Sequence, residues 1–146
     1  MDIIQALQDK NNQNAYQLLL ELETKFSETN ELYPYFEEFL KLIEHKNSFV
    51  RVRGFRLCCA QTPWDVDDKM GRHLHQLLTV LEDEKPAVVR QCLAALHSAI
   101  LRRPKLGSAI EPKLKTLNPS KYPGSMCSLI EKDIERLRKK TWTVQM

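Results

Sequence analysis

Glycine is scarce in this sequence, and long apolar runs are absent. Four of the 146 residues are glycine, each isolated from the others, so no glycine-rich phosphate-binding loop is present. No apolar run reaches 18 residues, and we therefore expect no membrane-spanning helix. The β-branched residues form no alternating runs of the kind that strands require. The composition consequently predicts an all-helical protein with a single domain over 1–146.

The four cysteines form no metal or disulfide pattern. Cys58, Cys59, Cys92 and Cys127 have spacings that fit no zinc motif. The first ten residues, MDIIQALQDK, are acidic and amphipathic and lack the charged-then-apolar layout of a signal peptide. Without that signal we expect buried core thiols, no disulfide framework, and a cytoplasmic location with the nucleus as the alternative.

No arrangement of side chains indicates catalysis or metal binding. His73 and His75 are two residues apart, so on a helix they point to different sides. Asp65, Asp67 and Asp68 are explained more simply by helix capping than by a cation site. No spacing indicates a Ser-His-Asp or Cys-His arrangement. We therefore expect no enzymatic activity, no cofactor and no bound metal.

The most informative stretch is 36–60, FEEFLKLIEHKNSFVRVRGFRLCCA, which predicts a helix, a polar turn and a second helix. Ser48 is suited to cap the second helix. Gly54 would lie in the middle of that helix, where glycine costs up to about 1 kcal/mol relative to alanine. A glycine there indicates close approach of a neighbouring helix. The apolar residues of the first helix recur at intervals of three and four, and they are Phe36, Phe39, Leu40, Leu42 and Ile43.

The hairpin pattern recurs in 78–99, LTVLEDEKPAVVRQCLAALHSA. Aligning Val50-Arg51 with Val89-Arg90 gives a period of 39 residues. Asp65 is suited to cap a further helix that runs to about residue 81. The second helices of successive hairpins are then expected to begin near residues 12, 48, 86 and 123. The four hairpins expected from this spacing are 2–28, 32–61, 65–102 and 107–140.

A two-helix unit of this length, with Val-Arg early in its second helix, resembles the HEAT repeat family of armadillo-type α-solenoids. The resemblance implies a right-handed α-α superhelix of about four stacked hairpins, with the second helices lining a concave surface. It also implies an Asp–Arg ladder between neighbouring repeats, for which Asp83 and Arg90 are suited. His45 and Lys46 stand where the earlier turn would need an acidic residue. Members of such folds bind proteins or nucleic acids far more often than they catalyse reactions.

Charge is unevenly distributed along the chain. Residues 1–101 carry a net charge of −4, and residues 102–146 carry +7. The basic half is suited either to an anionic partner or to a solvated cap at the end of the stack. Trp64, at a break between hairpins, is suited to plug the junction or to stack on a ligand. The candidate partner-binding residues are Arg51, Arg53, Arg56, Trp64, Arg90, Arg102, Arg103, Lys105, Lys113 and Lys115.

These observations favour a non-catalytic scaffold or adaptor that binds another protein through its helical groove. The alternative is a nucleic-acid-binding module that uses the basic residues of 102–140. A weaker third hypothesis is an enzyme of the DNA alkylation-repair glycosylase type, with Asp65 beside Trp64, but these residues lie outside any groove the sequence predicts. We expect a monomer or weak oligomer that does not bind membranes.

Overall fold

The computed structural model describes the backbone of residues 2–145 and the side chains of residues 2–140. The described backbone consists of helices, turns and irregular connections and contains no strand, so the predicted all-α class is confirmed there. Four long helices begin at residues 12, 48, 86 and 124, against predicted starts near 12, 48, 86 and 123. These long helices are α2 (Asn12–Phe26), α4 (Ser48–Ala60), α7 (Pro86–Arg102) and α9 (Gly124–Gln145).

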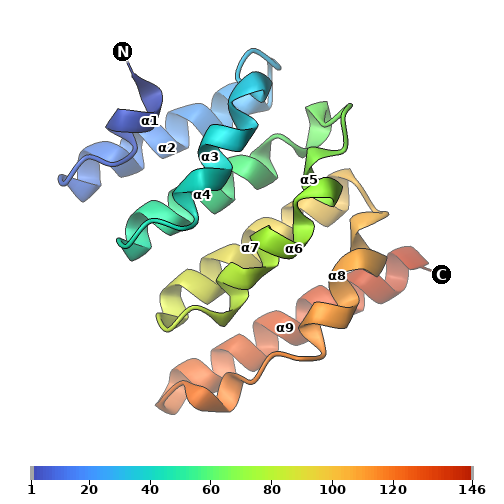
Figure 1. Cartoon of the computed structure of the whole chain (residues 1–146). Coiled ribbons are helices and arrows are strands. Elements are labelled where there is room, and N and C mark those ends of the chain that lie inside the picture. The colour runs from blue at the N-terminus through green and yellow to red at the C-terminus, as the bar shows by residue number, and fades with distance from the viewer. Residues whose placement is uncertain (1, 146) are drawn as a thin grey trace.

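The long helices lie side by side in chain order, and shorter helices form a second layer against them (Figure 1). Contacts join α2 to α4, α4 to α7, and α7 to α9. The short layer contains α1 (Ile3–Ala6), α3 (Phe36–Leu42), α5 (Lys69–Arg72), α6 (Leu74–Leu78) and α8 (Leu106–Leu114). Short 3₁₀ helices connect the layers, namely η1 (Tyr33–Tyr35), η2 (Thr62–Trp64), η3 (Thr79–Glu82) and η4 (Pro119–Lys121).

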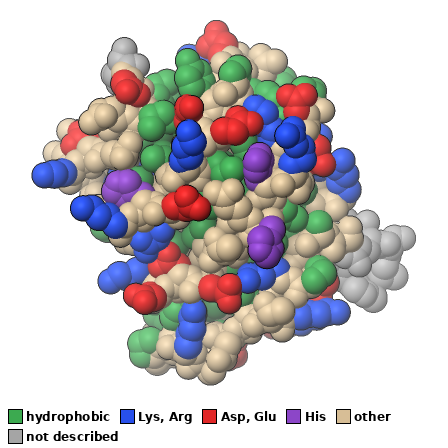
Figure 2. All heavy atoms as spheres, viewed as in Figure 1, with side chains coloured by type: hydrophobic (Ala, Val, Ile, Leu, Met, Phe, Trp, Pro, Cys, Tyr) green, Lys and Arg blue, Asp and Glu red, His purple; other side chains and the backbone are tan. Residues whose placement is uncertain are grey.

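A single apolar core lies between the two layers and runs from the first hairpin to the last. Each long helix contributes one side to it, so the opposite side, which we call the long-helix face, is turned away from the short helices. On α4 this division is clear. Gly54 packs against α3, whereas Arg56, two residues and about 200° further round the helix, lies on the long-helix face. Figure 2 shows the short-helix side of the molecule, where acidic and basic side chains are interspersed.

Two helix boundaries differ from the prediction. The helix expected from Asp65 to about residue 81 is divided into α5, α6 and η3, and it starts only at Lys69. Asp68 takes a left-handed conformation (φ 53°), which turns the chain before the helix can begin. His73 interrupts the helix again, with φ −110°. The last helix, expected to end near residue 140, continues to Gln145.

Arginine–aspartate pairs join neighbouring hairpins, from Arg51 to Asp83 and from Arg90 to Asp133. Nε and Nη2 of Arg51 donate to the two carboxylate oxygens of Asp83 at 2.8 and 3.1 Å. Nη1 of Arg51 donates to the carbonyl oxygens of His45 and Lys46, both at 3.0 Å. The earlier turn lacks an acidic side chain, and its backbone carbonyl oxygens accept the hydrogen bonds of Arg51 in its place. Arg90 pairs with Asp133 in α9, at 2.7 and 3.4 Å, so the second pair is formed between two helices.

The fully buried carboxylate of Asp65 holds the connection between η2 and α5. It accepts hydrogen bonds from the Tyr33 hydroxyl at 2.6 Å and from the backbone N–H groups of Lys69 and Met70 at 2.7 and 2.9 Å. Arg103, just beyond α7, donates to the same carboxylate at 3.3 Å and to the Asp65 carbonyl oxygen at 2.6 Å. The N-cap position of α5 is Asp68, so the prediction that Asp65 occupies it is wrong. The Asp65 carboxylate nevertheless accepts hydrogen bonds from the first two N–H groups of α5, and it joins Tyr33 of the second hairpin to Arg103 in the connection after α7.

Tyr33 gives this junction a pH dependence that can be measured. Burial and the hydrogen bond to Asp65 raise the pKa of Tyr33 from 10.0 to about 12. Between pH 10 and 12 the folded chain keeps the Tyr33 hydroxyl protonated, whereas the unfolded chain ionises it. The contribution of Tyr33 to the free energy of unfolding is therefore fully present below pH 10 and is lost as the pH rises toward 12. Thermal unfolding of the native protein and of Tyr33→Phe should therefore give melting temperatures whose difference shrinks between pH 10 and 12. A difference that stays constant over this interval would contradict the assignment.

Candidate functional site

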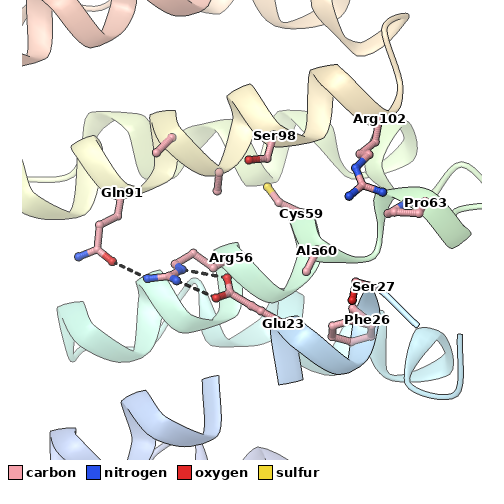
Figure 3. A pocket seen from close by; sticks show the side chains of 12 residues that line it. Glu23, Phe26, Ser27, Arg56, Cys59, Ala60, Pro63, Gln91, Ser98 and Arg102 are labelled. Atoms are coloured by element: carbon pink, nitrogen blue, oxygen red, sulfur yellow. Dashed lines mark hydrogen bonds and ion pairs between the residues drawn. The ribbon is translucent and has the colours of Figure 1, made fainter. Parts of the chain in front are cut away.

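A hollow of about 480 Å³ opens on the long-helix face between α2, α4 and α7 (Figure 3). α2 contributes Glu23 and Phe26 to its wall, and Pro63 of η2 closes one end. These positions come together because α4 packs against both α2 and α7. No local segment of the sequence contains the hollow, since its walls come from three hairpins.

Small side chains form the floor of this hollow. Ala60 of α4 and Ala94, Ala95 and Ser98 of α7 line it. The α7 residues recur at intervals of three and four, so they lie along one side of that helix, opposite its buried apolar side. Because these side chains are short, the helix backbones can be approached closely by another chain. Cys59 also lines the hollow, with its sulfur directed inward (Figure 3).

Arg56 is fixed at one end of the hollow by neighbours from two other helices. Its Nε and Nη2 donate to the two carboxylate oxygens of Glu23 at 3.0 and 2.7 Å, and its Nη1 donates to Oε1 of Gln91 at 3.1 Å (Figure 3). The Tyr16 ring centroid lies 6.0 Å from the guanidinium carbon. Burial opposes the charged form, but the hydrogen bonds and charge of Glu23 outweigh it and raise the pKa of Arg56. The side chain is therefore a preordered, permanently charged element of the wall.

A second hollow, of about 430 Å³, lies between α7 and α9. Leu93, His97 and Arg136 are among its lining residues. Gln91 and Ala94 line both hollows, which therefore meet across α7. We call the two together the long-helix groove. It extends across all four long helices, from α2 to α9.

The charged side chains of the groove that have no ion-pair partner within the described residues are all positive. The sequences of α4 and α7 contain five arginines and no aspartate or glutamate. Arg56 is matched by Glu23 and Arg90 by Asp133. Arg102 and Arg136 line the groove and have no ion pair with another residue of the described part of the chain. The groove consequently has an excess of positive charge.

Only two of the predicted partner-binding residues line the first hollow, namely Arg56 and Arg102. Arg53 is buried and donates to the Leu7 carbonyl oxygen and to Asn12 Oδ1, each at 2.9 Å, and burial lowers its pKa. Trp64 donates through Nε1 to the Phe26 carbonyl oxygen, which supports its role as a plug between hairpins. Arg51 and Arg90 join hairpins through Asp83 and Asp133, as described above.

The remaining predicted residues lie apart from the groove. Arg103 bonds the Asp65–Asp68 loop, and Lys113 pairs with Glu82 at 2.7 Å. Lys105 and Lys115 are exposed at the two ends of α8, in the short-helix layer. The basic residues of the C-terminal half are therefore distributed over both layers. The sequence prediction missed Glu23, Gln91, Ala94, Ala95, Ser98 and Arg136, although the α7 members among them share one helical side.

The described side chains contain no group of three or more His, Cys, Asp or Glu that could hold a metal ion. Burial raises the pKa values of Cys58, Cys59 and Cys92, which keeps these thiols protonated and weakly nucleophilic. Within residues 2–145, no helix is both long and apolar enough to cross a membrane. Comparisons with protein-family models, curated proteins and solved structures give no match.

Proposed function

We propose that this chain is a non-catalytic scaffold of HEAT-like hairpins, stacked as a right-handed α-α superhelix, that binds another protein in the long-helix groove. The order of the long helices, each packed on the next along the chain, supports the stacked arrangement. The Arg51–Asp83 pair, which joins the second helix of one hairpin to the turn of the next, supports the HEAT-like assignment. In such a stack the long helices line the inner surface.

The observation that carries this proposal is the groove itself. It combines hollows of about 480 and 430 Å³ with a floor of small side chains and walls of fixed polar groups. A protein segment with an apolar side can seat its side chains over Ala94 and Ala95 and reach polar partners at the edges.

Nucleic-acid binding by the basic C-terminal half is the second candidate, and the charge of +7 over residues 102–146 favours it. A phosphate backbone requires several cations that converge on one surface. Here Arg103 and Lys113 are paired with acidic side chains, and Lys105 and Lys115 lie at opposite ends of α8. The arrangement therefore supports protein binding more strongly.

The proposal can be tested with peptides selected from a random 16-residue display library against the native protein. Ala94 is exposed and lines both hollows, so Ala94→Trp should fill the groove and weaken binding of the selected peptides by tenfold or more. Fluorescence anisotropy with labelled peptides measures the change. Ala109→Trp is the matched control, because Ala109 is exposed on α8 in the short-helix layer.

Two outcomes would count against the groove. If Ala94→Trp binds the selected peptides as tightly as the native protein does, the peptides bind elsewhere. If the library yields no peptide, but single- or double-stranded DNA or RNA binds with a steep dependence on salt, the nucleic-acid alternative is supported. Circular dichroism of both tryptophan variants should first show that each is folded.

A further inference from the structure

We infer that the long-helix groove is selective for an acidic, amphipathic segment of the partner protein, whose carboxylates pair with Arg102 and Arg136. This inference rests on the proposed function and adds the chemistry of the partner.

The charges define the sign of the partner. α4 and α7, the two central long helices, contain no acidic residue, and the acidic groups that line the groove from α2 and α9 are Glu23 and Asp133. Both are already held by arginines, at 2.7 Å in each case. A basic segment would therefore meet two unmatched guanidinium groups without finding a free carboxylate in the groove. An acidic segment meets complementary charge without breaking an existing pair.

The paired arginines are poor competitors for the partner. Arg56 is held by a bidentate pair with Glu23 and also by Gln91, so its donors are already used. Arg102 and Arg136 have no such partners within the described residues, and both are exposed. Guanidinium groups in this condition bind carboxylates through two parallel hydrogen bonds, which adds geometric selectivity to charge attraction. Arg102 and Arg136 are thus the residues that select the partner.

The spacing of these two arginines requires more than one carboxylate. The Arg90–Asp133 pair places α9 residue 133 beside α7 residue 90, and Arg136 lies less than one turn further along α9. α7 and α9 run in the same direction (Figure 1), so Arg136 is close to the level of Leu93. Arg102 is nine residues beyond that level, or about 13 Å along the helix axis. A single carboxylate cannot reach both, so the partner segment needs at least two acidic positions.

Exposed apolar side chains on the long helices add an apolar component. Tyr16 of α2 is 47% exposed while its ring contacts the fixed Arg56, and Leu101 of α7 is 52% exposed. Leu101 follows Ala94 by seven residues and His97 by four, so it lies on the same side of α7 as the second hollow. Exposed apolar side chains on α2 and near the end of α7, together with the small residues of the groove floor, favour a segment that is amphipathic as well as acidic.

The test uses the composition and the arginine dependence of selected peptides. Peptides of 16 residues selected from a random display library on the native protein should contain Asp and Glu well above the input frequency. A selected peptide, labelled for fluorescence anisotropy, should bind Arg102→Glu and Arg136→Glu at least tenfold more weakly than the native protein. The same peptide with Gln and Asn in place of Glu and Asp should lose a similar factor.

Lys105→Glu is the matched control. It changes the net charge of the protein by the same amount, and Lys105 is exposed but lies at the start of α8, outside the groove. The affinity of Lys105→Glu for the labelled peptide should stay within about twofold of the native value. Titration at two salt concentrations measures the effect of net charge alone, and this effect is subtracted first. Melting temperatures of all three variants show whether any loss of binding reflects unfolding.

The outcomes separate this inference from the proposed function. Loss of binding in Ala94→Trp together with unchanged binding in both arginine variants would keep the groove as the docking site and overturn the selectivity for acidic segments. Equal weakening by Lys105→Glu would overturn it as well, since only net charge would then matter. A labelled 16-nucleotide DNA or RNA oligonucleotide that binds more tightly than any selected peptide, with the same arginine dependence, would assign the two arginines to phosphate groups.

Discussion

Replacing Asp65 with alanine is expected to lower the free energy of unfolding by about 3–5 kcal/mol. The Asp65 side chain is fully buried and accepts hydrogen bonds from Tyr33, from the N–H groups of Lys69 and Met70, and from Arg103. Alanine would leave the hydroxyl and the two N–H groups without their acceptor in a buried site. Arg103 would keep Asp68, at 3.2 Å, as a partial partner. Urea denaturation monitored by circular dichroism measures the loss.

Asp67→Ala is the matched control for this experiment. Asp67 lies two residues away and is exposed, so its replacement should change the free energy of unfolding by less than about 0.5 kcal/mol. Asp65→Asn retains one carbonyl acceptor but presents an amide donor to the other N–H groups, and its cost should fall between the two alanine variants. If Asp65→Ala cost no more than Asp67→Ala, the buried carboxylate would not be the centre of this junction.

The sequence could predict the helices well because their signals are local. Apolar spacing of three and four residues located the long helices, and α2, α4, α7 and α9 start within one residue of the expected positions. Trp64, for which the sequence leaves a plug or a ligand-stacking role open, donates through Nε1 to the Phe26 carbonyl oxygen in the first hairpin. The sequence did not predict the division of the helix over 69–82. Asp68, which takes the left-handed conformation just before this helix, contacts the distant Arg103.

The groove could not be predicted from the sequence either, because contacts between distant parts of the chain place its residues. Arg51 and Arg90 look like candidate ligand-binding residues in the sequence, but their partners, Asp83 and Asp133, lie 32 and 43 residues further along the chain. Which arginines remain unmatched is decided by packing between hairpins. Arg136, one of the two unmatched arginines of the groove, was counted only as part of a basic C-terminal region. Its position in the groove depends on how α9 packs against α7.

Gly54 provides the second strong test of how the layers are joined. An alanine Cβ at this position would lie 2.6 Å from the Leu42 Cβ and 2.6 Å from the Phe39 carbonyl oxygen. One of these atoms belongs to the backbone of α3, so no change of rotamer can relieve the contact. We expect Gly54→Ala to lower the free energy of unfolding by about 3 kcal/mol. Chemical denaturation gives the value directly.

The sign of this effect is informative because helix propensity predicts the opposite. In a helix that is free of neighbours, replacing glycine with alanine stabilises by up to about 1 kcal/mol. Ala94→Gly, at an exposed position of α7, measures the difference in helix propensity between alanine and glycine in this protein. It should lower the free energy of unfolding by about 1 kcal/mol. A loss at Gly54 therefore measures the close approach of α3 and α4. Because α4 also carries Arg56, Gly54→Ala should disturb peptide binding in the groove as well. A more stable Gly54→Ala protein would show that α3 can move away from α4 at little cost, and that the two layers are not rigidly joined.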